Sequence, residues 1–141
     1  MNIIIGCDHG GFELKQEIMT FLLEHDHQVM DAGCYSTDSV DYPDFASEVC
    51  RAIDTQTTDK GILICGTGIG MSIAANRYPG IRAALCMEPF SARMSREHND
   101  ANVLCLGGRL TGVSLATAIV DTWLNTEFSG GRHQRRIDML E

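Results

Sequence analysis

The chain has 141 residues, 44% of them hydrophobic, and a formal net charge of −8. This length suits one domain with a substantial core and is too short for two, so we expect a single domain over residues 1–141. The negative charge argues against a nucleic-acid or acidic-membrane surface. Neither a signal segment nor an apolar run of about 18 residues is present, so we expect a soluble cytoplasmic protein.

Six cysteines raise the question of a disulfide framework. No C-x-x-C pair occurs, and Cys65 and Cys105 lie inside aliphatic runs. This usage is typical of reduced thiols in a reducing compartment. His and carboxylate residues show no metal-ligand spacing, so we expect neither a metal nor another cofactor.

Short aliphatic runs alternate with amphipathic stretches along the chain. The predicted strands are residues 3–7, 28–31, 61–65, 81–86 and 103–106, and the predicted helices are residues 12–25, 42–54, 69–76, 90–98, 111–125 and 132–140. The strands are continuously apolar, which is typical of a parallel sheet covered on both faces. Alternating strands and helices therefore predict a doubly wound α/β domain.

In such sheets, ligands bind beyond the carboxyl ends of the strands. The segments that follow the predicted strands carry glycines and reactive side chains, at residues 7–11, 65–70, 87–89 and 107–109. This edge of the sheet is therefore where we expect a functional site.

The loop at residues 66–70 runs from a strand straight into a helix and contains three glycines. Its backbone N–H groups can approach a phosphate, a carboxylate or a developing enolate. A dinucleotide site is a second possibility, although its spacing needs glycine at position 71, where the chain has Met71. Glu88, near the end of the next strand, keeps that alternative open. A tight turn without a ligand is the third.

Cys65 directly precedes this loop and is either a small buried hydrophobic residue or a thiolate base. Asp8 and His9 end the first strand and favour a polar ligand contact. His98 follows a predicted helix and is either a helix cap or a general acid. We expect His98 and the pair Asp8–His9 to lie at the same edge of the sheet.

Arg132 and Arg136 are four residues apart, so on a helix they project from one face. Two guanidinium groups make a good phosphate clamp. The other interpretation is a solvated basic helix on an acidic protein.

Five motifs occur in order, at residues 7–11 (CDHGG), 41–44 (DYPD), 65–70 (CGTGIG), 95–102 (SREHNDAN) and 130–133 (GGRH). With them the chain resembles the type B ribose-5-phosphate isomerases, a family that includes the galactose-6-phosphate isomerase subunits. The resemblance spans nearly the whole chain. It implies a three-layer α/β/α Rossmann-like fold with a five-stranded parallel sheet, metal-free aldose–ketose isomerisation in the pentose phosphate pathway, and homodimers that can pair into tetramers.

The resemblance also implies roles for matching positions. Cys65 is similar to the base that moves a proton between C2 and C1, Thr67 to its partner on the sugar oxygens, and His98 to the acid that opens the sugar ring. The positions that match substrate contacts are Asp8, Tyr42 and Asn99 for the sugar and enediolate, Gly66, Gly68, Ile69 and Gly70 for the oxyanion, and His9, Arg109, Arg132 and Arg136 for the phosphate. The family builds its site at the subunit interface, so part of it should come from a second chain.

One branch of the family lacks the cysteine and has a glutamate where this chain has Met71; here cysteine is present and glutamate is absent. We therefore expect Cys65 to be the base and ribose 5-phosphate to be the substrate, with allose 6-phosphate a further one. A hexose-6-phosphate isomerase of the galactose type, or a non-enzymatic phosphate- or nucleotide-binding module, are the alternatives.

Overall fold

The structure is a computed structural model that describes residues 1–140, in which strands and helices alternate. The strands are β1 (Asn2–Cys7), β2 (Gln28–Asp31), β3 (Lys60–Cys65), β4 (Ala83–Leu85) and β5 (Val103–Gly107). The helices are α1 (Phe12–Glu24), α2 (Tyr42–Asp54), α3 (Ile69–Ala75), α4 (Pro89–Glu97), α5 (Val113–Leu124) and α6 (Arg132–Asp138). None of these helices is long and apolar enough to cross a membrane.

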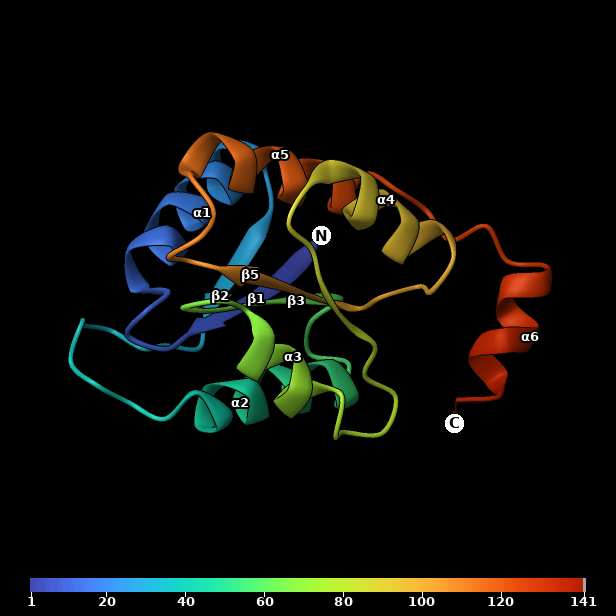
Figure 1. Cartoon of the computed structure of the whole chain (residues 1–141), viewed down its shortest axis with the longest axis horizontal. Helices are drawn as coiled ribbons and strands as arrows, with labels where there is room; N and C mark the ends of the chain where they lie inside the picture. Colours follow the sequence, from blue (N-terminus) through green and yellow to red (C-terminus); the bar gives the residue numbers. More distant parts are fainter. Residues whose placement is uncertain (141) are drawn as a thin grey trace.

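All five strands are parallel and lie in the order β2-β1-β3-β5-β4. Helices α1, α4 and α5 cover one face of the sheet, α2 and α3 cover the other, and α6 stands to one side of both layers (Figure 1). The chain moves outward from β1 in one direction to β2 and in the other to β3, so the switch point lies between β1 and β3. The predicted three-layer fold is confirmed.

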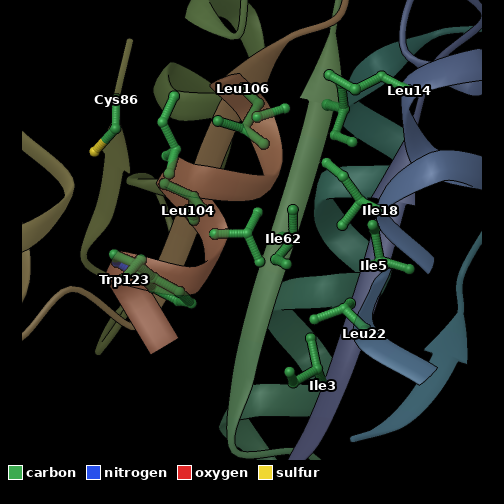
Figure 2. Close-up of a cluster of buried hydrophobic side chains, with 14 of the residues drawn as sticks. Ile3, Ile5, Leu14, Ile18, Leu22, Ile62, Cys86, Leu104, Leu106 and Trp123 are labelled. Carbon is green, nitrogen blue, oxygen red and sulfur yellow. The ribbon is translucent and has the colours of Figure 1, made fainter. Parts of the chain in front are cut away.

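The sheet separates two clusters of buried side chains because successive residues of a strand point to opposite faces. Ile3 and Ile5 of β1 point toward Ile18 and Leu22 of α1, in the cluster that also contains Trp123 of α5 (Figure 2). Ile4, between them, belongs to the other cluster, with Val49 of α2. Each fully buried aliphatic side chain contributes about 2 kcal/mol, and this explains why the strand sequences are continuously apolar.

The predicted strand at residues 81–86 is shorter than expected, with only Ala83–Leu85 paired. The N–H of Arg82 donates to the side-chain oxygen of Asn102, and the N–H of Ala83 donates to that of Asn76. Side chains thus take the hydrogen bonds that a longer β4 would make, on a strand that lies at the edge of the sheet. The other predicted boundaries agree with the structure within two residues.

A buried ion pair fastens α1 to the segment that follows β2. Lys15 is fully buried, and its Nζ lies 2.7 Å from Oδ1 of Asp31 and also donates to the carbonyl of Cys34. The same Asp31 oxygen accepts from the N–H of Gly33 at 2.9 Å. This network holds the chain just beside the end of β1.

Three loops at the carboxyl edge of the sheet touch backbone to backbone. They follow β1, β3 and β5, and their hydrogen bonds run from Asp8 N to Ile64 O (3.1 Å), from Gly108 N to Cys65 O (2.8 Å) and from Arg109 N to Gly66 O (3.0 Å). A side chain at Gly108 would put its Cβ 2.5 Å from the carbonyl oxygen of Gly10. The loops can meet only because this position has no side chain.

We predict that Asp31→Ala lowers the free energy of unfolding by about 3 kcal/mol, because it leaves the buried Lys15 ammonium without its counterion. Lys15→Met should cost less, since the Asp31 carboxylate is partly exposed and can be hydrated. Arg51→Ala is the control: it breaks an exposed pair with Glu48 and should cost under about 1 kcal/mol. Urea unfolding at one protein concentration measures all three, and equal costs for Asp31→Ala and Arg51→Ala would contradict the prediction.

Gly108→Ala should lower the free energy of unfolding by about 1–3 kcal/mol, because the new methyl group pushes the loop after β1 away from the loop after β5. Gly112→Ala is the matched control, since its φ is −66° and nothing lies within 4 Å of the added Cβ. The same urea titration compares the two variants. Equal free energies of unfolding would contradict the prediction, because they would show that the three loops can move apart without loss of stability.

Candidate active site

Cys65 is the last residue of β3, at the point where the three loops meet. Its side chain is 5% exposed, and its Sγ accepts a hydrogen bond from the N–H of Gly68 at 3.1 Å. Gly68 has φ of +80°, and a Cβ there would lie 2.5 Å from the Leu85 side chain, so only glycine brings its N–H to the sulfur. The thiol therefore lies against the glycine loop that precedes α3.

Four of the other cysteines, Cys7, Cys50, Cys86 and Cys105, lie in environments that keep them protonated. All six are free and buried. Burial raises the pKa of Cys7 to about 12 and that of Cys50 to about 11, and it raises the pKa values of Cys86 and Cys105 as well. These four thiols remain neutral at physiological pH and behave as small apolar side chains.

His9 and Arg109 line a cavity of about 210 Å³ beside the glycine loop. The N–H of Val40 donates to Nδ1 of His9 at 3.2 Å, so the neutral ring carries its proton on Nε2 and can donate it to a ligand. The Arg109 side chain lies over Gly66, where a Cβ would be 3.3 Å from its guanidinium nitrogen. Together the two side chains offer hydrogen-bond donors and positive charge to an anion.

Asp8, Thr67 and Tyr42 complete this edge. Asp8 is buried, and its Oδ1 accepts from the N–H of Gly10 at 2.8 Å, which fixes the carboxylate. Oγ1 of Thr67 accepts from the N–H of Ile69 at 3.2 Å, so the hydroxyl proton points elsewhere and is available to a ligand. The Tyr42 ring, at the start of α2, lies 2.9 Å from where a Cβ on Gly70 would be.

The predicted placement of His98 is wrong. His98 ends α4 and lies at the amino end of β5, because the Arg82 guanidinium at the start of β4 donates to the carbonyls of Asn99 and Asp100. Cys65 is paired with Gly107 at the carboxyl end of β5. With about 3.3 Å per strand residue, the two ends of β5 are some 13 Å apart. His98 and Cys65 of one chain therefore lie toward opposite ends of β5.

His98 and Asn99 instead share a cavity of about 410 Å³ with the α6 residues Arg132, His133 and Arg136. The predicted pairing of the two arginines on one helix face is confirmed. Gly130 and Gly131, with φ of +66° and +59°, turn the chain into α6, and the N–H of Ser129 donates to the carbonyl of Glu97 at the end of α4. These two features bring the first turn of α6 beside His98.

The structure thus divides the predicted residues into two half-sites. The loop half-site, at the carboxyl edge, contains Asp8, His9, Tyr42, Cys65, Gly66, Thr67, Gly68, Ile69, Gly70 and Arg109. The helix half-site, at the amino end of β5, contains His98, Asn99, Arg132 and Arg136. Sequence reasoning missed His133, although it follows Arg132 in the GGRH motif, and it missed the contact between Val40 and His9, for which the sequence of that loop offers no signal.

Glu88, which kept a dinucleotide site open, has a structural role. Its carboxylate accepts from the N–H of Ser91 at 2.9 Å and so caps α4, and this hydrogen bonding lowers the pKa of Glu88. Met71, at the position where the dinucleotide pattern needs glycine, is fully buried in the same cluster as Cys65. Within residues 1–140, no three His, Cys, Asp or Glu side chains are grouped to hold a metal ion.

Comparison with known proteins gives a consistent result. Residues 3–140 match the ribose/galactose isomerase family. The chain is 52% identical to ribose-5-phosphate isomerase B of Escherichia coli, over 98% of this chain and 93% of that protein, and 45% identical to ribose-5-P isomerase B of Listeria innocua, over 100% and 95%.

Solved structures agree with the sequence relatives. Ribose-5-phosphate isomerase B of Clostridium thermocellum superposes with a TM-score of 0.98 at 56% identity, covering 99% of this chain and 95% of that one. The type B enzyme of Trypanosoma brucei gives 0.95 at 46% identity, with the same coverage. Identity at this level over the whole length sets aside the dinucleotide site and the non-enzymatic binding module. The chain belongs to the ribose/galactose isomerase family.

Proposed function

We propose that the protein interconverts ribose 5-phosphate and ribulose 5-phosphate through an enediolate, with Cys65 as the base that moves the proton. The observation that carries the proposal is the position of the Cys65 thiol against the glycine loop, in a chain whose relatives are ribose-5-phosphate isomerases. An aldose–ketose isomerase needs a base at carbon and a nearby set of donors for the oxygen that becomes negative.

In the forward direction, the Cys65 thiolate takes the proton from C2 of the open-chain aldose, and the electrons move onto the carbonyl oxygen at C1. Backbone N–H groups of the glycine loop stabilise the resulting oxyanion, apart from those of Gly68 and Ile69, which donate to Cys65 and Thr67, and each such donor is worth about 3 kcal/mol. The Thr67 hydroxyl, whose oxygen already accepts from Ile69, transfers or holds the proton between the two sugar oxygens. Cys65 then returns its proton to C1, which gives the ketose.

The separation of the two half-sites supports a site made by two copies of the chain. The loop half-site supplies the base and the donors His9 and Arg109. The helix half-site of a second copy supplies His98, which opens the furanose ring, Asn99, and the arginines 132 and 136. Four basic side chains then hold the phosphate, and two-fold symmetry gives a homodimer two identical sites.

Pentose and hexose phosphates share the reacting C1–C2 unit and a terminal phosphate and differ in the carbons between them, so we assign ribose 5-phosphate from the relatives. Allose 6-phosphate and hexose 6-phosphates of the galactose type belong in the same substrate panel. Exchange of carbon-bound protons in D₂O, followed by NMR, detects the reaction on each of them. Absence of exchange with every pentose and hexose phosphate would refute the isomerase assignment.

Cys65→Ala should reduce proton exchange at C1 of ribulose 5-phosphate by at least about 10³-fold, because no other group replaces the base. Binding of the sugar phosphate, measured by calorimetry, should change little, since the phosphate contacts remain. Cys50→Ala is the control and should keep near-normal exchange, since this buried α2 thiol contacts the carbonyl of Ala75 at the last residue of α3, the end away from the glycine loop. Near-normal exchange in Cys65→Ala would assign the base to another residue.

Mixing two inactive variants tests the shared site. Cys65→Ala damages only the loop half-site and His98→Ala only the helix half-site, so co-expressed chains that pair at random should form complete sites at about a quarter of positions. We therefore expect about a quarter of wild-type turnover of ribose 5-phosphate. Pairing the double variant with Cys65→Ala is the control and should give none. If the mixture is no more active than its parents, both half-sites act within one chain.

A further inference from the structure

His133 lines the same cavity as the helix half-site, and the proposed function leaves it without a role. Its ring stacks on that of His98, with ring centroids 4.2 Å apart and planes 13° from parallel. The two rings come from separate elements, the end of α4 and the first turn of α6. Hydrogen bonds from Ser129 N to Glu97 O and from His133 N to Gly130 O hold the connecting backbone, so the stack is fixed from both sides.

The His98 ring depends on this contact for its orientation. Its side chain is exposed, and within residues 1–140 no hydrogen bond holds either ring nitrogen. A ring that can rotate about two side-chain torsions delivers its proton to a given oxygen only part of the time. Stacking on His133 removes much of that freedom and leaves the edge of the ring with its nitrogens open to a ligand.

The charges around the pair favour an uncharged His133. Burial lowers the pKa of His133, and the neighbouring His98, Arg132 and Arg136 lower it further, while Glu97 opposes them. Two protonated rings at stacking distance would repel each other, which also favours the neutral form of His133.

We propose that His133 is a positioning residue, whose stacked ring holds His98 in the orientation from which it protonates the ring oxygen of the closed sugar. This inference rests on the proposed function. In ring opening, the bond between C1 and the ring oxygen breaks, the ring oxygen gains the proton of His98, and the C1 hydroxyl loses its proton to solvent. The aldehyde that forms then enters the proton transfer at Cys65.

The two substrates of the reaction separate ring opening from proton transfer. Ribose 5-phosphate closes into a furanose through its C4 oxygen, whereas ribulose 5-phosphate cannot, because its C5 oxygen carries the phosphate. Exchange at C1 of the ketose in D₂O therefore needs the base and the oxyanion donors but no ring-opening acid. If His98 loses its orientation, turnover of ribose 5-phosphate should fall, whereas proton exchange at C1 of ribulose 5-phosphate should be unchanged.

His133→Ala should lower kcat for ribose 5-phosphate by about tenfold, which is a part of the rate enhancement that a general acid contributes. Proton exchange at C1 of ribulose 5-phosphate should stay within about twofold of wild type. His133→Phe restores a flat, uncharged ring and should keep the aldose kcat within about threefold. Arg135→Ala, on the same helix but outside the cavity, is the control and should match wild type in both assays.

Equal losses in the two assays for His133→Ala, or a His133→Phe variant no better than His133→Ala, would overturn the positioning role. Thermal unfolding of each variant identifies any that fold poorly, and the ratio of the two activities in the folded fraction still decides the question. Failure of the wild-type protein to exchange the ketose proton would refute the proposed function, and is thereby distinguishable from failure of the inference.

Discussion

The contact between the backbones of three loops is the constraint on which the rest of the site depends. Gly108 lies against the carbonyl of Gly10, and the hydrogen bond from Gly108 N to Cys65 O joins the loop after β5 to the end of β3. Because the backbones of these segments are in direct contact, the side chains that they carry cannot move independently. Asp8, Cys65 and Arg109 are consequently held in one place by the sheet itself and need few contacts of their own.

The carboxyl edge of the sheet could be predicted from the sequence, because its signals are local. Continuous apolar runs such as residues 61–65 identify buried parallel strands, and the glycines after them mark the turns that bring backbone to a ligand. Since parallel strands share an edge, Cys65 and His9 could be placed together without knowing the strand order. The structure confirms this part and adds the donors to Cys65 and His9, which the sequence could not reveal.

The amino edge was predicted less well, for a physical reason. His98 closes a helix that returns the chain to the start of the next strand, so it must lie at the edge opposite the strand ends. The imidazole of His98 suggested a role in catalysis and so a place at the carboxyl edge of the sheet. Its position in the chain, just before β5, indicated the amino edge instead. The stack with His133 had no sequence signal at all, because it depends on how α6 stands beside α4.

The separation of the half-sites gives the two edges different physical tasks. Cys65 is 5% exposed and lies where water has little access, which suits a base that must act on carbon and donors that must act on an oxyanion. His98 and the α6 arginines are exposed, which suits groups that meet a hydrated phosphate and a closed sugar first. In the dimer that we propose, the carboxyl edge of one chain meets the amino edge of the other, so that assembly itself excludes water from the reacting carbons.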